Sequence, residues 1–263
     1  MKIEYAARVE IGRRETNDDR VLADGQVLDR TARSGRVALP AVFALCDGCG
    51  GYDGGGIAAQ TVLETLSREA AESLKDESGI SRAMDRCLQA VLEKKSEMPS
   101  YAKMCTTIAG CVFGENAIAF FHSGDSRIYR FDRWGSAKMT VDHSAVRQMV
   151  DMGMITEEEA LIHPNRNVIT QCIGIECPPP EIYISGASIA PGEKYLLCSD
   201  GFWESVSAEQ AEEILSRNIS LAEMADALVE EALLQGSDDN TSVCICAAGG
   251  DAAVTDSKPY VLE

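Results

Sequence analysis

The sequence predicts an α+β fold in which antiparallel sheets are covered by helices. Apolar runs of strand length alternate with segments of helical periodicity, and several strands are joined by turns too short for a parallel crossover. The 263 residues, 45% of them hydrophobic, are enough for one sizeable core, and neither a repeat nor a long linker divides them. We therefore expect one domain over residues 1–248 and a polar, glycine-led tail over residues 249–263.

Strand-like segments recur along the whole chain. The apolar run at residues 42–46, followed by glycines, is typical of a strand buried on both faces. Residues 104–113 and 117–131 are predicted to form consecutive strands around a turn at Gly114-Glu115-Asn116. Further strands are expected at residues 3–9, 182–184, 194–198 and 243–246.

Helical segments lie between these strands. Apolar residues recur at helical spacing over residues 57–74 and 80–92, which predicts helices with one buried face. Between residues 144 and 162 the pattern predicts short helices, the second of which begins with a capping box at Thr156 to Glu159. Two later helices are expected to begin near Ser207 and at Ser220.

The composition excludes several classes of partner. Acidic residues outnumber basic ones by 42 to 24, and the formal net charge is −18 at pH 7. This balance argues against nucleic acid and anionic membranes, because both attract lysine and arginine. No apolar stretch approaches the ~18 residues of a membrane span, and the N-terminus lacks the apolar region of a signal peptide. Ten cysteines without an export signal favour reduced thiols, so we expect a cytoplasmic protein.

Aspartates stand at the ends of four of the strand-like segments. Asp47, Asp125 and Asp200 each follow an apolar run, and Asp239 precedes one. An aspartate at the end of a single strand often only caps a turn. If the strands pack together, however, all of these carboxylates can meet at one end of the core. After Asp47, glycines at positions 48, 50 and 51 let the backbone turn sharply and bring its carbonyl groups close to a ligand.

These side chains are hard oxygen ligands, and no histidine accompanies them at a zinc spacing. Such a set suits Mg²⁺ or Mn²⁺ better than Zn²⁺ or copper. Two such ions about 3.5–4 Å apart can share a water, lower its pKa and direct it at a phosphoryl centre. Arg14 lies in a charged turn at residues 12–20, and its planar guanidinium is suited to phosphate oxygens. The alternative interpretation of residues 12–20 is a solvated loop without a binding role.

The cysteines and histidines have other interpretations. Cys46 and Cys49 match the Cys-x-x-Cys pattern of redox and zinc sites, but Cys46 ends a buried strand and no second pair lies at zinc-ribbon spacing. His122, His143 and His163 lie in different elements, which favours a structural role for each.

Seven short motifs follow one another along the chain: Arg14-Glu15-Thr16-Asn17-Asp18-Asp19, Asp47-Gly48-Cys49-Gly50-Gly51, Thr106-Thr107, Gly124-Asp125-Ser126-Arg127, Thr140-Val141-Asp142-His143-Ser144, Ser199-Asp200-Gly201 and Asp239-Asn240. In this order they resemble the metal-dependent Ser/Thr protein phosphatases of type 2C, the PPM family, and above all its bacterial single-domain members. The resemblance runs from about residue 6 to residue 247. A His-Pro-x-Arg segment at residues 163–166 matches the flap of the bacterial members.

The resemblance implies a four-layer α-β-β-α sandwich of two mostly antiparallel sheets flanked by helices. It also implies two Mn²⁺ or Mg²⁺ ions in a cleft at one edge of the sheets, and a position for a third ion. By position, Asp47 would bridge the two ions and the carbonyl of Gly48 would bind one of them. Asp200 and Asp239 would complete the shell of the other.

The remaining site residues are implied in the same way. Asp18 stands where the family usually has a glutamate that holds a metal through water, and Asp125 with Asp200 matches the third metal position. Arg14 matches the phosphate-binding arginine, so Arg14 and Asp47 are the implied catalytic residues. The implied reaction is in-line attack of a water bridging the ions on phosphoserine or phosphothreonine, without a phospho-enzyme. The implied partners are phosphorylated proteins, substrates of a cognate Ser/Thr kinase, and we expect the enzyme to be a monomer.

The chain departs from the family pattern at four positions, none of which is a direct metal ligand. Asp18 is one methylene shorter than glutamate, Cys49 replaces the usual methionine or histidine, Cys105 replaces a glycine, and Gly56 replaces a common glutamate. The change at position 49 leaves the general acid unidentified. The alternative function is that of a pseudophosphatase, which binds phosphoproteins without cleaving them. Residues 144–174 are expected to form a flap that shapes substrate access.

Overall fold

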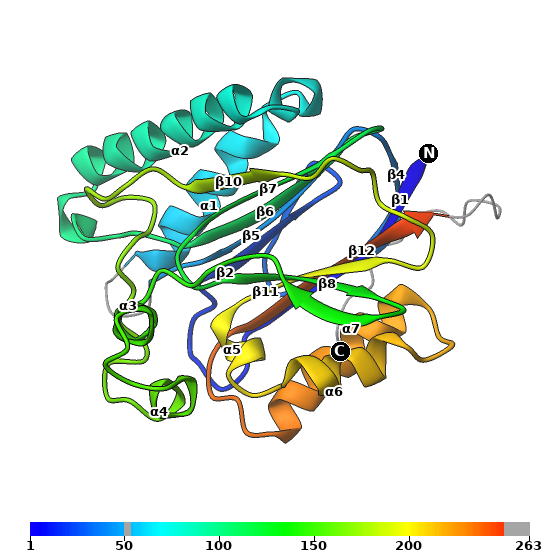
Figure 1. The fold of residues 1–263 in the computed structure, drawn as a ribbon. Coiled ribbons are helices and arrows are strands. Elements are labelled where there is room, and N and C mark those ends of the chain that lie inside the picture. Colours follow the sequence, from blue (N-terminus) through cyan, green and yellow to red (C-terminus); the bar gives the residue numbers. More distant parts are fainter. Residues whose placement is uncertain (50–53, 250–263) are drawn as a thin grey trace.

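The computed structural model describes residues 1–49 and 54–249, which form two six-stranded sheets packed face to face (Figure 1). The β1 sheet has the order β4-β1-β12-β11-β8-β9, and the β5 sheet has the order β10-β7-β6-β5-β2-β3. Every strand pair in them is antiparallel. The strands are β1 (Lys2–Glu10), β2 (Asp19–Ala23), β3 (Gln26–Leu28), β4 (Ala32–Ala38), β5 (Ala41–Asp47), β6 (Ile108–Phe113), β7 (Ile118–Ser123), β8 (Arg127–Asp132), β9 (Gly135–Lys138), β10 (Glu181–Ile184), β11 (Lys194–Cys198) and β12 (Thr241–Gly249).

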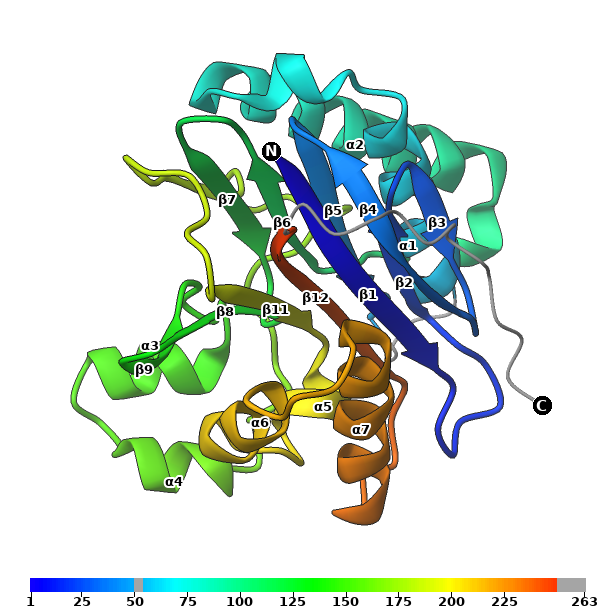
Figure 2. The same cartoon turned by 90° about the vertical axis from the view of Figure 1, so that its right-hand side faces the viewer.

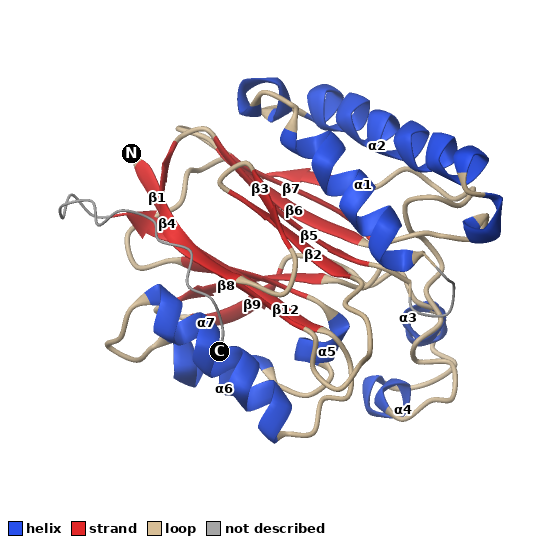
Figure 3. Ribbon diagram, turned by 180° about the vertical axis from the view of Figure 1, so that it is seen from behind, coloured by secondary structure: helices blue, strands red, loops and turns tan. Residues whose placement is uncertain are grey.

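Helices cover the outer face of each sheet (Figures 2 and 3). The β5 sheet is covered by α1 (Gly55–Ser67) and α2 (Glu77–Glu97), with the 3-10 helices η1 (Ala71–Leu74) and η2 (Pro99–Tyr101) beside them. The β1 sheet is covered by α5 (Asp200–Trp203), α6 (Ala208–Leu215) and α7 (Leu221–Leu234). Two short helices, α3 (Ala145–Asp151) and α4 (Glu157–Leu161), lie outside these layers.

Apolar cores fill the spaces between the layers. Phe43 and Leu45 of β5 face the core between the two sheets, where the ring of Phe43 lies 5.3 Å from that of Tyr5. Ala44 and Cys46 point the other way, into the core under α1 and α2. This alternation follows from the two-residue period of a strand, and it means that β5 is buried on both faces. The predicted α-β-β-α sandwich is confirmed.

Local signals predicted the helix starts well. The side chains of Thr156, Ser207 and Ser220 each accept a hydrogen bond from the third residue of the helix that follows, and each forms a complete capping box. The helix expected over residues 57–74 ends earlier, at Ser67, and η1 follows it.

The continuous strand expected over residues 117–131 is wrong. The chain bends after β7 and crosses to the other sheet, where it continues as β8. Gly124 makes this bend with φ of 112°, and a Cβ there would lie 2.6 Å from the side chain of Thr107. Apolar patterning cannot show a change of sheet, and the glycine was the only local signal. Strands β2, β3 and β4 were not predicted, because β3 is short and the middle of β4 is polar and only half-buried.

Some expectations concern residues at the limits of the described chain. Gly50, Gly51 and residues 250–263 lie outside the described residues. Strand β12 includes Gly249, one residue beyond the boundary expected for the domain. Within residues 1–49 and 54–249, no helix combines the length and the hydrophobicity needed to cross a bilayer.

Candidate metal centre

A cavity of about 910 Å³ opens at the end of the sandwich where β5 and β11 finish. The residues predicted for the site all line it: Arg14, Asp18, Asp47, Gly48, Asp125, Asp200 and Asp239. The structure thus brings together side chains that are up to 225 residues apart in the sequence. The metal and catalytic roles of the individual residues stay predictions.

The strand ends place the aspartates. Asp47 is the last residue of β5, and Asp200 begins α5 directly after β11. Asp125 lies in the bend between β7 and β8, and Asp239 lies just before β12. Because β5 belongs to one sheet and β11 and β12 to the other, carboxylates from both sheets meet at the same end of the molecule.

The backbone at Asp47 is satisfied by two threonines. The N–H of Asp47 donates to Oγ1 of Thr107 at 3.0 Å, and the N–H of Thr107 donates to the carbonyl of Asp47 at 2.8 Å. The hydroxyl of Thr106 donates to the same carbonyl at 2.8 Å. A Cβ on the next residue, Gly48, would lie 2.2 Å from the carbonyl carbon of Gly55, so only glycine fits there. The carboxylate of Asp47 is therefore not needed to cap the strand end.

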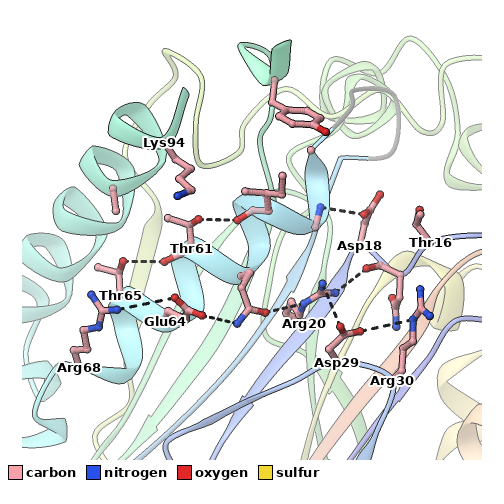
Figure 4. A pocket seen from close by; sticks show the side chains of 17 residues that line it. Thr16, Asp18, Arg20, Asp29, Arg30, Thr61, Glu64, Thr65, Arg68 and Lys94 are labelled. Atoms are coloured by element: carbon pink, nitrogen blue, oxygen red, sulfur yellow. Dashed lines mark hydrogen bonds and ion pairs between the residues drawn. The ribbon is translucent and has the colours of Figure 1, made fainter. Parts of the chain in front are cut away.

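Asn240, just before β12, holds the N-terminal segment at residues 11–18 against the site. Its side-chain oxygen accepts the N–H of Asp18 at 2.8 Å, and its amide nitrogen donates to the carbonyls of Ile11 and Thr16 at 2.9 Å. Asp18 in turn accepts the N–H of Gly56, at the start of α1, at 3.1 Å (Figure 4). A Cβ at position 56 would lie 2.7 Å from Oδ1 of Asp18. The short acid at position 18 and the glycine at position 56, both departures from the family pattern, thus fit together in space.

Asp18 also borders a second cavity, of about 660 Å³, which lies beside α1 (Figure 4). Here charges of opposite sign face each other: Arg20 lies 3.5 Å from Asp29, and Arg68 lies 4.0 Å from Glu64. The first cavity differs, because its carboxylates crowd together.

Asp19, for which the motifs predict no role, is buried behind this cluster with 1% of its surface exposed. The hydroxyl of Ser199 donates to its Oδ2 at 2.7 Å, and its own N–H donates to Oδ1 of Asn17 at 3.1 Å. The available signal was its position in a dense polar run, directly before the apolar residues at positions 21–23. Whether that position is buried depends on the packing of β2 against the other sheet.

Crowding and burial raise the pKa values of four carboxyl groups in and behind the cluster. Burial, with the charges of Asp200 and Asp19, holds the pKa of Asp47 well above its usual range. Burial, with the charge of Asp200, raises the pKa of Asp125 to about 8. Burial, with the charge of Asp239, raises that of Asp200 to about 6, and burial raises that of Asp19 to about 7. Acids of like charge in such a cluster must share protons or hold a cation.

The donor set fits divalent cations. The predicted donors are carboxylate oxygens and the backbone carbonyl of Gly48, and oxygen atoms of these kinds are the ligands that Mg²⁺ and Mn²⁺ prefer. The charge of such ions would remove the repulsion that raises the pKa values of these acids.

Arg14 lies at the rim of the cavity with half of its side chain exposed. Its Nη2 lies 2.8 Å from Oδ2 of Asp239, and its Nε donates to the carbonyl of Asp238 at 3.1 Å. The predicted phosphate-binding group is therefore beside a predicted metal ligand.

A neighbouring cavity of about 580 Å³ shares Asp125 with the first one. In its wall, Arg127 donates from Nε and Nη2 to Asp142, at 3.1 and 2.6 Å, and its guanidinium lies 3.5 Å from the ring centre of Trp203. The indole of Trp203 donates to the carbonyl of Asp125 at 3.0 Å. Arg127 and Asp142 both lie in the motifs, but their spacing in sequence gave no sign of this pair.

The histidines support the same region. The rings of His122 and His143 stack with their centres 4.7 Å apart. Nδ1 of His143 accepts the N–H of Gly124, and Nε2 of His122 lies 2.9 Å from the carbonyl of Val141. These contacts hold the bend between β7 and β8 in place.

Two six-stranded antiparallel sheets under flanking helices, with a carboxylate cluster where both sheets end, define an α-β-β-α protein with a candidate divalent-metal centre. The family described as Protein phosphatase 2C matches residues 23–235 of the chain. The chain belongs to the protein phosphatase 2C family, and its enzyme class is that of protein phosphatases.

Individual relatives agree with this assignment. A protein of Streptococcus pyogenes named "Putative protein phosphatase 2C-type" is 31% identical over 207 residues, which are 76% of this chain and 83% of the relative. The serine/threonine protein phosphatase PstP of Mycobacterium tuberculosis is 32% identical over 250 residues. That match covers 92% of this chain but only 44% of the mycobacterial protein, so the chain spans less than half the length of this relative.

A solved structure of the catalytic domain of PstP, in complex with two manganese ions, superimposes with a TM-score of 0.78 at 30% identity. The match covers 97% of this chain and 99% of the PstP chain. The catalytic domain of this relative thus shares the fold over nearly the whole length of the solved chain, and it holds two manganese ions.

Proposed function

We propose that this chain is a metal-dependent protein serine/threonine phosphatase, which hydrolyses phosphoserine and phosphothreonine in proteins. The observation that carries the proposal is the carboxylate cluster, contributed by both sheets, in a cavity that also holds Arg14. Membership of the protein phosphatase 2C family and the manganese-bound relative support it.

In this proposal the metal ligands are those predicted from the sequence. Asp47 and the carbonyl of Gly48 would hold one Mn²⁺ or Mg²⁺, Asp47 with Asp200 and Asp239 would hold a second, and Asp18 would act through a water. Asp125 with Asp200 would offer a third position. When bound, two such ions lower the pKa of a shared water and neutralise the charge of a phosphate.

The chain's own residues position the substrate. The threonine contacts fix the backbone of Asp47, and so the point from which its carboxylate enters the cavity. The planar guanidinium of Arg14 is suited to bind two phosphate oxygens, once it exchanges Asp239 for the substrate. An in-line attack requires the phosphorus to lie between the attacking water and the leaving oxygen of the serine or threonine, and Arg14 would help to hold the phosphate in that orientation. The substrates would be phosphoproteins modified by a cognate Ser/Thr kinase, and the enzyme would act as a monomer.

Turnover of para-nitrophenyl phosphate with Mn²⁺ and with EDTA tests this function. We expect activity that requires the metal, and Asp200→Asn should lower it about 1,000-fold, which corresponds to about 4 kcal/mol. The exposed Asp85→Asn on α2 is the matched control, and it should leave the rate unchanged. Turnover that is equal in EDTA would contradict the mechanism. A folded protein without turnover in any divalent ion, but with retained phosphopeptide binding, would favour the pseudophosphatase.

Residues 144–174 remain a proposed flap. The segment carries α3 and α4, and an isolated bridge between Ser144 and Ile169 pairs its two ends. A second bridge, between Thr106 and Ile173, joins it to the body. Asn167, Val168 and Ile169 line the cavity. Exchange of this segment for that of a relative should change the preference among phosphopeptides while para-nitrophenyl phosphate turnover persists. An unchanged peptide preference would count against the flap.

A further inference from the structure

Three cysteine side chains that the proposed reaction does not use lie together in the wall of the same cavity. The Sγ atoms of Cys49, Cys105 and Cys172 all lie within 4.8 Å of one another. Cys105 and Cys172 are buried, and Cys49 is half-buried. The three residues come from distant parts of the sequence, so their meeting is a product of the fold.

Backbone hydrogen bonds hold the three segments side by side. The N–H of Cys49 donates to the carbonyl of Cys105 at 3.0 Å. On the other side, Thr106 and Ile173 exchange a pair of backbone hydrogen bonds of 3.0 and 2.8 Å. Each cysteine is therefore next to, or part of, a short ladder that fixes its Cα position. These backbone bonds set the distances between the three segments at the cluster.

The spacing and type of the donors fit a thiophilic cation. In a tetrahedral site with zinc–thiolate bonds of about 2.3 Å, the sulfur atoms lie about 3.8 Å from one another. The sulfur–sulfur distances in this cluster are all within 4.8 Å, so small side-chain movements would bring them to that spacing. Lys95 also lines the cavity, and its ammonium group donates to the carbonyl of Gly174, two residues after Cys172. This positive charge lies near what would be an anionic site.

We propose that Cys49, Cys105 and Cys172 bind one thiophilic divalent cation, of the zinc class, in a site separate from the aspartate cluster. Binding of the ion releases three thiol protons and forms three metal–sulfur bonds, and no oxidant is needed. All three cysteines line the cavity, so a water could supply the fourth ligand. Cys49 follows Gly48, and Cys172 belongs to the 144–174 segment. The ion would therefore connect that segment to the turn that carries the metal centre.

Cobalt provides a probe that distinguishes the two sites. Cobalt bound to thiolates gives an intense sulfur-to-metal charge-transfer band in the near ultraviolet, whereas carboxylate ligands give none. The full chain, reduced and kept in excess Mg²⁺, should develop this band up to one cobalt per chain, and zinc should abolish it. The band should be lost in Cys105→Ser and in Cys49→Ser, whose half-buried side chain makes unfolding less of a concern.

Two variants serve as controls. Asp200→Asn should keep the band, which separates this site from the aspartate cluster and from the outcome of the activity test. Cys177→Ser should also keep it, because Cys177 donates to the carbonyl of Cys172 at 3.2 Å but is outside the group of three sulfur atoms. The proposal is overturned if the reduced, folded protein gives no band, if the band survives in Cys105→Ser, or if Cys177→Ser removes it. A disulfide between two of the cysteines, with no band after reduction, would also overturn it.

Discussion

Two buried carboxylates lie close to each other at the end of the sandwich, yet their surroundings shift their pKa values in opposite directions. Asp125 is 6% exposed and Asp142 is 9% exposed, and both line the same neighbouring cavity. Burial and the charge of Asp200 raise the pKa of Asp125 to about 8. Burial also opposes ionisation of Asp142, but hydrogen bonds and charge from Arg127, helped by Lys138, outweigh it and lower the pKa of Asp142.

The difference is the source of the positive charge. Asp142 receives it from side chains of its own chain, so this carboxylate is balanced in any solution. Asp125 and the acids beside it repel one another, and the nearby cations Arg14 and Arg127 leave the pKa of Asp125 raised. Their remaining charge must be balanced by protons or by ions from outside. One acid stabilises the structure, whereas the other belongs to a cluster that costs stability until a ligand binds.

The largest expected effect comes from breaking the balanced pair. Arg127→Leu should lower the free energy of unfolding by about 3–5 kcal/mol, because it leaves the carboxylate of Asp142 buried without its main partner. Urea unfolding in EDTA measures this change. The control is Arg147→Leu, which removes more exposed ion pairs with Asp151 and Glu157 and should cost at most about 1 kcal/mol.

A double variant sharpens the result. Arg127→Leu combined with Asp142→Asn should recover part of the loss, because no buried charge is then left unpaired. If the double variant is as unstable as the sum of the single ones, the charge pair is not the cause.

The unbalanced acids should make the metal-free protein less stable as the pH rises. Asp200, Asp19 and Asp125 have folded-state pKa values of about 6, 7 and 8, all above the value of 3.8 for a free side chain. Between these limits the folded state binds more protons than the unfolded state, so the free energy of unfolding falls with rising pH. The expected slope is about 1.4 kcal/mol per pH unit for each extra proton that the folded state holds, so it is steepest near pH 5 and shallower near pH 8. Urea unfolding in EDTA from pH 5 to pH 8 measures it.

Two comparisons test this assignment. Asp125→Asn should reduce the slope, and saturating Mn²⁺ should reverse the loss of stability at pH 8. His122 has a lowered pKa because of burial, so it acts in the opposite direction near pH 6, but it is one group against several. A stability that is flat or rises from pH 5 to pH 8 in EDTA would contradict the account.

The aspartates of the site could be predicted because their signal is local. An apolar run that ends in Asp-Gly fixes both a strand and the residue at its tip, as at Asp47 and Asp200. Antiparallel sheets under helices and most helix caps follow from signals of the same kind, whereas the arrangement in two stacked sheets came from the family resemblance. The bend at Gly124 could not be predicted, since a change of sheet depends on which surfaces pack together.

The sequence could not show which distant residues contact one another in the folded chain. Asp19 is accompanied by Ser199, which lies 180 residues further along the chain. The Cys-x-x-Cys pattern pairs Cys49 with Cys46, but the alternation of side chains along β5 turns Cys46 into the core under α1 and α2. Cys49 instead meets Cys105 and Cys172. In both cases the deciding contact joins segments that no local pattern relates.

The smallest expected effect on stability concerns Arg14. This side chain pairs with an acid of the cluster, as Arg127 pairs with Asp142, but it is half exposed. Its ion pair with Asp239 is half exposed, so it contributes little to stability and can be exchanged for a phosphate. Arg14→Ala should therefore leave the free energy of unfolding nearly unchanged while kcat/KM falls about tenfold, or about 1.4 kcal/mol. Arg14→Lys keeps the charge but loses the planar pair of donors, so it should restore only part of the rate. If Arg14→Ala changes stability rather than kcat/KM, Arg14 belongs with Arg127 as a structural cation and does not bind the substrate.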